Sequence, residues 1–285
     1  MAIKIVIDSA SDIDLEEAQA LGVTLVPMEI QFSDEKYSDG VTLSHKEFFE
    51  KLVESADLPK TSQINPYSFE EKFAPLVEAG HEVIAITISS KLSGTFRNAQ
   101  AAAKKFGKKV FAVDSLNASI GERLLCLYAL RLIEEEKTAE EIVRKLEEAK
   151  KRINLIAVLD TLKYLKKGGR ISALTAFAGE MLSIKPVIGI IDGAVKVIGK
   201  AIGSKKGNNL LNTLVREKGV DFTMPYGVIW SGLDDAMLVK YLKDSEHLWR
   251  YQTENVPSYL IGSTIGTHIG PGGIGVAFFS EECGE

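Results

Sequence analysis

Cysteine and histidine are scarce in this sequence, and their scarcity excludes several kinds of site. The 285 residues include two cysteines and four histidines, and none of them has the spacing of a metal-binding motif. Cys126 lies within a helical pattern and Cys283 lies near the C-terminal end, so the two predict neither a disulfide framework nor a redox motif. The sequence therefore predicts no metal site.

Long apolar runs are also absent. No stretch reaches the roughly 18 apolar residues of a membrane-spanning helix, and the N-terminal residues lack the order of a signal peptide. The formal net charge is -5, which argues against a surface for nucleic acid. We therefore expect a cytoplasmic protein with no integral membrane segment and no nucleic-acid partner.

The signatures of several enzyme classes are missing as well. The chain has no Gly-x-Ser-x-Gly motif, the turn that presents a nucleophilic serine. The glycine- and lysine-containing segment 199–205 fails the spacing of a phosphate-binding loop. The glycine-rich turn at Gly270–Gly275 leads into an expected strand and so lacks the helix that binds a dinucleotide. We therefore expect neither catalytic residues nor a cofactor.

The first part of the chain alternates strand and helix patterns. Apolar, β-branched runs predict strands at Ile3–Ile7, Val83–Ile88, Val110–Val113 and Leu155–Leu159. Capping-box spacings at Ser44, Ser68 and Thr138 mark the starts of helices between these strands. This alternation predicts a Rossmann-like α/β domain with a parallel sheet over residues 1–159.

Beyond Leu159 the pattern changes to antiparallel pairing. Asp192-Gly193 separates the apolar runs Pro186–Ile191 and Ala194–Ile198 and has the chemistry of a type I′ hairpin turn. Further strands are expected at Gly227–Trp230, Tyr259–Thr264 and Gly275–Phe279, with helices between them. We therefore expect an α+β domain with a mixed or antiparallel sheet over residues 160–285.

The segment Ser89–Thr95 carries small hydroxyl residues from a predicted strand into a helix that begins near Phe96. The unpaired N–H groups and the positive dipole of a first helical turn favour an anion, and hydroxyls add donors without a competing charge. This segment is therefore a candidate site for a phosphate or a carboxylate. The alternative is that Ser93 only caps the helix.

Two pairs of polar residues follow other strands of the predicted parallel sheet. These are Asp8-Ser9 and Asp114-Ser115. Ligands of open α/β sheets collect at the carboxyl ends of the strands, so we expect both pairs to share one rim of the sheet with Ser93.

Three more motifs have both a functional and a structural interpretation. Thr61 and Ser62 contribute two hydroxyls, His268 precedes the glycine-rich turn, and basic residues surround Gly168-Gly169. A local turn, a histidine paired with a neighbour and a solvated charge cluster are the respective alternatives.

The segment 173–182 has a single charge in ten residues. Its larger apolar residues, Leu174, Phe177 and Met181, are irregularly spaced among small ones. Such a segment is usually a core helix, and the alternative is that it forms the wall of an apolar cavity between the domains.

Taken together and in order, these motifs resemble the DegV family. The order is Asp8-Ser9, Thr61-Ser62-Gln63, Ser89 to Thr95, Asp114-Ser115, Gly168 to Ser172 and Thr267 to Gly272. The resemblance spans almost the whole chain and implies a two-domain α/β protein that binds a long-chain fatty acid between its domains. It also implies a role as the lipid-carrying subunit of a bacterial fatty-acid kinase, whose separate ATP-dependent subunit makes acyl phosphate for phospholipid synthesis.

The resemblance also assigns roles to particular residues. It implies that Thr61, Ser93 and His268 bind the carboxylate, and we add their neighbours Ser62, Gly94 and Thr95. The expected acyl-chain cavity includes Leu174, Phe177 and Met181, and the expected docking surface for the kinase subunit includes Lys167, Arg170, Lys200 and Lys205. One departure is Ile202, which stands where the family pattern Lys-x-Arg-Gly has arginine.

Two alternatives to a non-catalytic fatty-acid carrier stay open. One is an acyl hydrolase or transferase with Ser93 as the nucleophile and His268 as the base. A nucleophilic serine needs an activating base, and none is identifiable beside Ser93 in the sequence. The other alternative is a carrier of a different apolar carboxylate.

Overall fold

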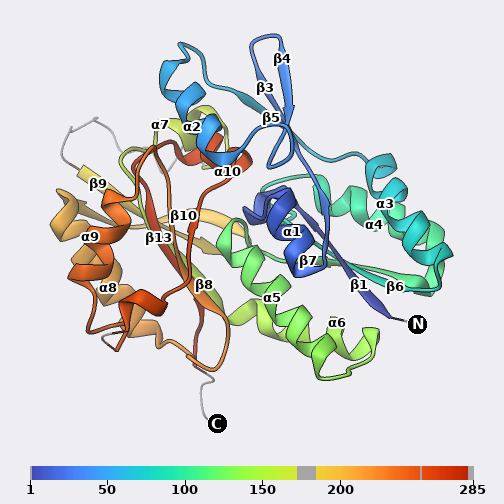
Figure 1. Ribbon diagram of the computed structural model, residues 1–285. Coiled ribbons are helices and arrows are strands. Elements are labelled where there is room, and N and C mark those ends of the chain that lie inside the picture. Colours follow the sequence, from blue (N-terminus) through green and yellow to red (C-terminus); the bar gives the residue numbers. More distant parts are fainter. Residues whose placement is uncertain (1, 172–183, 251, 282–285) are drawn as a thin grey trace.

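The computed structural model of the protein describes residues 2–171, 184–250 and 252–281. These residues form three sheets with helices packed around them (Figure 1). The expected parallel sheet and mixed sheet are both confirmed. No helix within these ranges is long and apolar enough to cross a membrane.

The first sheet is entirely parallel. Its strands lie in the order β2 (Thr24–Val26), β1 (Ile3–Asp8), β6 (Glu82–Thr87) and β7 (Val110–Asp114). The helices of this part of the chain are α1 (Leu15–Leu21), α3 (Pro66–Glu78), α4 (Thr95–Ala103), α5 (Ile120–Glu134) and α6 (Ala139–Ala149). Alternate strand residues point to opposite faces, so Val6 packs with α3 and α4 while Ile5 and Ile7 pack in the cluster that contains α5 and α6.

The second sheet has six strands and is mixed. Its order is β10 (Ala194–Ile202), β9 (Ile184–Ile191), β8 (Ile153–Val158), β13 (Ile274–Phe279), β11 (Tyr226–Trp230) and β12 (Ser258–Leu260). Only the pair β11 and β12 is parallel. The associated helices are α7 (Lys163–Lys167), α8 (Ser204–Lys218), α9 (Ala236–Asp244) and α10 (Ser263–Ile269).

A small antiparallel sheet, β4–β3–β5, completes the fold. It consists of β4 (Glu35–Ser38), β3 (Glu29–Phe32) and β5 (Lys60–Ser62), and α2 (His45–Glu54) follows β4. Helix α5 contacts strands of both larger sheets and lies between them (Figure 1). A single apolar cluster therefore extends from the parallel sheet across α5 to the six-stranded sheet.

Three expectations about local structure are wrong. The run Leu155–Leu159, assigned to the parallel sheet, lies mainly in β8 and pairs antiparallel with β13 and β9. Ser68 is not a helix cap, because Asn65 caps α3 one turn earlier and bonds the Ser68 N–H at 3.0 Å. The strand expected over Tyr259–Thr264 ends at Leu260, and its last two residues begin α10.

The hairpin and two helix starts are as predicted. Asp192 and Gly193 join β9 and β10 with φ values of 52° and 80°, the positive pair that a type I′ turn requires. Ser44 and Thr138 each form a reciprocal capping box with a glutamate three residues on. Because β8 pairs only within the six-stranded sheet, we propose that the division between the two sheets precedes Ile153 rather than following Leu159.

Candidate functional site

A pocket opens at the carboxyl ends of the parallel strands, where the first sheet faces the second. Its walls come from β5, the segment after β6, the segment before α5, one face of the six-stranded sheet and α10. The space free of protein atoms is about 850 Å³, including the part open to solvent.

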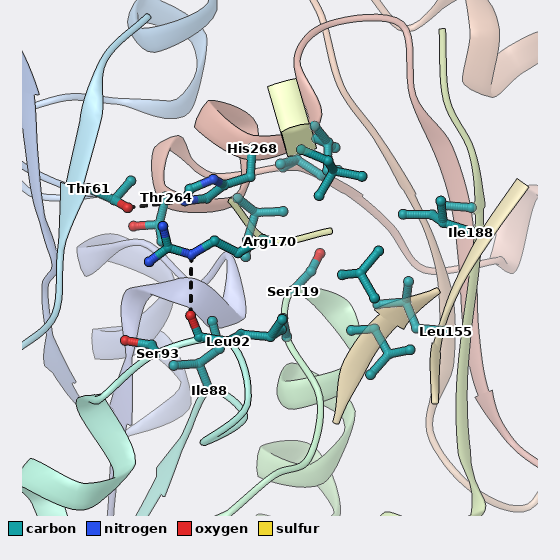
Figure 2. Close-up of a pocket in the computed structure, with 18 of the residues that line it drawn as sticks. Thr61, Ile88, Leu92, Ser93, Ser119, Leu155, Arg170, Ile188, Thr264 and His268 are labelled. Atoms are coloured by element: carbon teal, nitrogen blue, oxygen red, sulfur yellow. Dashed lines mark hydrogen bonds between the residues drawn. The ribbon is translucent and has the colours of Figure 1, made fainter. Parts of the chain in front are cut away.

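One long wall of the pocket is apolar. It consists of side chains that four strands of the six-stranded sheet project from one face: Leu155, Ala157, Ile188, Ile190, Val195 and Ile229. Figure 2 shows Leu155 and Ile188 at the end of the pocket away from His268. These residues share one face because the pleat directs alternate side chains of a strand to the same side of the sheet.

The opposite end of the pocket is polar. Thr61, Thr264, Arg170 and His268 gather there (Figure 2). The Oγ1 atom of Thr61 lies 3.1 Å from Nε2 of His268, and the tautomer of the ring decides which of them donates. The Arg170 side chain donates to the carbonyls of Leu92 and Gly168. Uncharged donors and one cation therefore converge at the end of an apolar cavity.

His268 is held uncharged in this position. Burial and, to a smaller extent, the nearby positive charge of Arg170 together lower the pKa of its imidazole to about 4. Its Nδ1 has no hydrogen-bond partner among the described residues. That atom faces Gly168, where a Cβ would lie 2.2 Å from it, so the ring fits only because residue 168 has no side chain.

Ser93 lies on the pocket wall rather than at the capping position. The N-cap of α4 is Gly94, and no side chain caps that helix. The Ser93 hydroxyl lies 2.9 Å from Oγ1 of Thr95 and accepts the Thr95 N–H at 3.2 Å. The structural alternative, a conventional helix cap at Ser93, therefore does not describe this residue.

The other residues expected beside Ser93 have different positions. Ser62 and Gln63 line the pocket with Thr61, whereas Gly94 and Thr95 do not. Gly94 makes room for Gln63, because a Cβ there would lie 1.9 Å from Oε1 of that side chain. Thr95 is buried, and its hydroxyl accepts the Ile64 N–H at 3.3 Å.

The acidic residues at this rim hold the loops that shape the pocket. Asp8 is buried and accepts the N–H groups of Ala10 and Ile88, and burial raises its pKa to about 7. Asp114 accepts the N–H groups of Ser90 and Leu116. Asp8, Ser9, Asp114 and Ser115 do share the rim expected of them, but none of them lines the pocket.

Thr264 is a pocket residue that the sequence did not indicate. Its buried hydroxyl has no hydrogen-bond partner among the described residues, and Figure 2 shows Thr264 at the same end of the pocket as Thr61. The strand expected over Tyr259–Thr264 gave no reason to select it. The observed helix places it four residues before His268, so the two side chains share one helix face.

The expected docking residues lie on different elements. Lys167 ends α7 and is exposed, Lys200 lies on β10, and Lys205 lies in the first turn of α8. Arg170 lines the pocket and also borders a surface groove with Lys91 and Lys196. The expected cavity residues Leu174, Phe177 and Met181 lie outside the described residues.

The pocket offers no evident metal ligands. No group of three or more His, Cys, Asp and Glu side chains that could hold a metal ion occurs within the ranges the structure describes. Its polar end carries hydroxyls, an amide, an imidazole and a guanidinium, which are donors suited to an anion rather than to a cation.

Comparison with known proteins gives matches over almost the whole chain. A family model described as "Uncharacterised protein, DegV family" matches residues 2–281. The chain is 35% identical over 285 residues to a DegV domain-containing protein of Caldanaerobacter subterraneus, which covers 98% of this chain and 99% of that relative.

Solved structures also match the fold over almost the whole chain. One is a DegV family protein from Thermus thermophilus described by its fatty-acid binding, with a TM-score of 0.85, 30% identity and coverage of 99% of this chain and 100% of that one. Another is a stearic acid-binding protein from Eubacterium ventriosum, with a TM-score of 0.81, 26% identity and coverage of 98% of both chains.

Proposed function

Because this chain belongs to the DegV family, we propose that it binds a long-chain fatty acid in the pocket between its two larger sheets. The acyl chain lies along the apolar face of the six-stranded sheet, and the carboxylate lies at the polar end. One observation carries the proposal: the pocket is apolar along the face of the six-stranded sheet and gathers Thr61, Thr264, Arg170 and His268 at one end. That polarity matches an amphipathic ligand with one anionic head.

The polar end is suited to a carboxylate in particular. The hydroxyls of Thr61, Ser93 and Thr264 donate to an anion without adding charge, and Arg170 supplies a positive charge nearby. Hydrogen bonds to a charged acceptor each contribute about 1.5–3 kcal/mol. The unpartnered hydroxyl of Thr264 is a buried group whose desolvation a ligand would compensate.

Holding a carboxylate is favoured over hydrolysing an acyl group. The Nε2 atom of His268 contacts Thr61, whereas the hydroxyl of Ser93 bonds Thr95. A serine nucleophile needs a base in contact with it, and that base needs a third group to orient it. No orienting partner of His268 Nδ1 occurs among the described residues. The protein is therefore proposed to be a carrier, with no catalytic residue and no cofactor of its own.

The test of the carrier proposal is a titration of delipidated protein with matched ligands. Hexadecanoic acid, hexadecanol and hexadecane share a chain length and differ only at the head. We expect the acid to bind most tightly, by at least about tenfold over the alcohol, since one charge-assisted hydrogen bond accounts for that ratio. Equal binding of all three would contradict a carboxylate site. If the protein bound another apolar carboxylate but not hexadecanoic acid, the carrier proposal would stand with that carboxylate as the ligand.

We further propose that the bound carboxylate is presented to a separate fatty-acid kinase subunit. Exposed Lys167 and Lys205 are the cations for docking an acidic partner, while Arg170 serves the pocket and its rim. Ile202 is 63% exposed and brings no charge to this surface, although the family pattern places arginine there.

Reversing the charge of the docking lysines distinguishes presentation to the kinase subunit from binding of the fatty acid. We expect Lys167→Glu together with Lys205→Glu to leave the Kd for fatty acid unchanged and to slow acyl-phosphate formation by the kinase subunit of the same organism. The parent reaction itself should slow as salt rises, since screening weakens electrostatic docking. Equal turnover by parent and variant would reject this docking surface.

A further inference from the structure

Helix α10 lacks a capping side chain of its own. Its N-cap residue is Gly262, which has no side chain to accept the N–H groups of the first turn. Those groups are buried with the helix, since Ser263 and Thr264 are both buried. Unpaired buried N–H groups are costly, so another part of the molecule has to accept them.

Two buried aspartates from the N-terminal part of the chain supply the acceptors. Asp39 accepts the Ser263 N–H on Oδ1 at 2.9 Å and the Thr264 N–H on Oδ2 at 3.0 Å. Asp12 accepts the Gly262 N–H on Oδ1 at 2.8 Å. Both carboxyl groups are almost completely buried. The start of α10 is thus held by residues more than two hundred positions earlier in the chain.

Both aspartates have other contacts that fix their own positions. The backbone N–H of Asp39 donates to the carbonyl of Met28 at 3.0 Å, and Met28 lines the pocket. The Oδ2 atom of Asp12 accepts the hydroxyl of Ser119, another pocket residue. The aspartates are therefore tied to the pocket wall as well as to the helix.

We infer that Asp39, assisted by Asp12, is a positioning residue for the carboxylate-binding end of the pocket. This inference rests on the proposed function. Asp39 bonds the backbone of Thr264 itself, and His268 lies four residues later on the same short helix. A helix of seven residues is too short to hold its own position, so release of its first turn displaces both side chains.

The apolar wall does not depend on this contact. Leu155 and Ile188 are held by the hydrogen-bond ladders of β8 and β9. Loss of Asp39 should therefore reduce recognition of the head group and spare recognition of the chain. A residue with only a structural role would lower binding of acid and alcohol by the same factor.

The experiment compares Asp39→Ala with the parent for binding of hexadecanoic acid and hexadecanol. We expect the preference for the acid to fall by about tenfold, the equivalent of one charge-assisted hydrogen bond at the displaced end. Asp39→Asn keeps one acceptor oxygen and should restore part of the preference, giving a loss of about threefold. Asp39→Asn is also the variant to measure if Asp39→Ala does not fold.

Thr138→Ala is the matched control, because Thr138 caps α6 away from the pocket. It should lower stability and leave the preference for the acid unchanged. A folded Asp39 variant with the parent's preference would overturn the positioning role while the proposed function stands. A parent that binds neither ligand, or binds both equally, would overturn both.

Discussion

The two ends of the pocket are built in different ways. The apolar end is one face of a sheet, and its side chains come from strands β8, β9, β10 and β11, which backbone hydrogen bonds join into one sheet, β11 through β13. The polar end is assembled from an edge strand, a loop, a seven-residue helix and the residue Arg170 after α7. The acyl chain of the ligand is therefore held by a regular sheet. Its carboxylate is recognised by segments that are distant in the sequence and that only the fold brings together.

The largest expected effect is on the apolar end. Each methylene buried against the sheet contributes about 0.8 kcal/mol, so lengthening the ligand from twelve to sixteen carbons should strengthen binding by up to about 3 kcal/mol. Ordering of the longer chain reduces this figure. Titration with the even-numbered saturated acids measures it. An affinity independent of chain length would show that the chain does not lie on the sheet.

The next largest effect is on the polar end. Ser93→Ala removes one donor to the carboxylate and should weaken binding by about 1.5–3 kcal/mol. Stability should also fall, because the Ser93 hydroxyl accepts the N–H of Thr95 at the start of α4, so the change in affinity separates the two roles. Ser90→Ala is the control, since Ser90 lies in the same loop and does not line the pocket. If Ser93→Ala loses about 1 kcal/mol of stability and keeps its affinity, the capping interpretation is right instead.

A smaller effect tests how His268 is placed. Gly168→Ala puts a methyl group where it would meet Nδ1 of His268, so the ring must shift and its contact with Thr61 is disturbed. We expect a loss of about 1 kcal/mol in fatty-acid affinity, the size of one ordinary hydrogen bond. The neighbouring Gly169 has a φ of 69° and open space around it, so Gly169→Ala should cost stability through backbone strain alone. If Gly168→Ala and Gly169→Ala lost the same affinity, the position of the His268 ring would not contribute to fatty-acid binding.

The smallest effect on binding is expected from Glu122→Gln, which should change stability only. Glu122 is buried with no partner for either carboxyl oxygen among the described residues. Burial and then the carboxyl groups of Asp8 and Asp12 raise its pKa well above the ordinary value of 4.5. The native state therefore holds a proton that the unfolded state releases, and stability falls as the pH rises above about 4.5.

Glu122→Gln has no carboxyl group at this position and so should not lose this stability as the pH rises. Its stability relative to the parent should therefore increase from pH 5 to pH 8 in urea unfolding, while its affinity for fatty acid equals that of the parent. A stability difference that does not vary with pH would mean that the Glu122 carboxyl titrates normally in the native state.

The sequence predicted the regular elements better than the assembled ones. Strands β1, β6 and β7 and the β9–β10 hairpin have local signals, namely β-branched runs and the Asp192-Gly193 turn. Helix α10 has no such signal. Its glycine and β-branched residues suit a strand, and the carboxylate that caps it is Asp39, far away in the sequence.

The same reason explains which site residues were predictable. Thr61, Ser93 and His268 were selected from the order of short motifs, and all three line one pocket. Thr264 was missed because only the helical spacing to His268 and its unpaired hydroxyl point to it. The docking role expected of Arg170 stays a prediction. Its place on the pocket wall, where its side chain donates to the carbonyls of Leu92 and Gly168, depends on the fold.

The most direct test of the account is the native mass of the protein as purified from its own cells, followed by extraction of any bound lipid. A pocket with an apolar wall and a single polar end predicts a complex heavier than the polypeptide by one long-chain fatty acid, and the extract should contain that acid. A mass equal to that of the bare polypeptide, together with no uptake of labelled palmitate or oleate, would contradict the account.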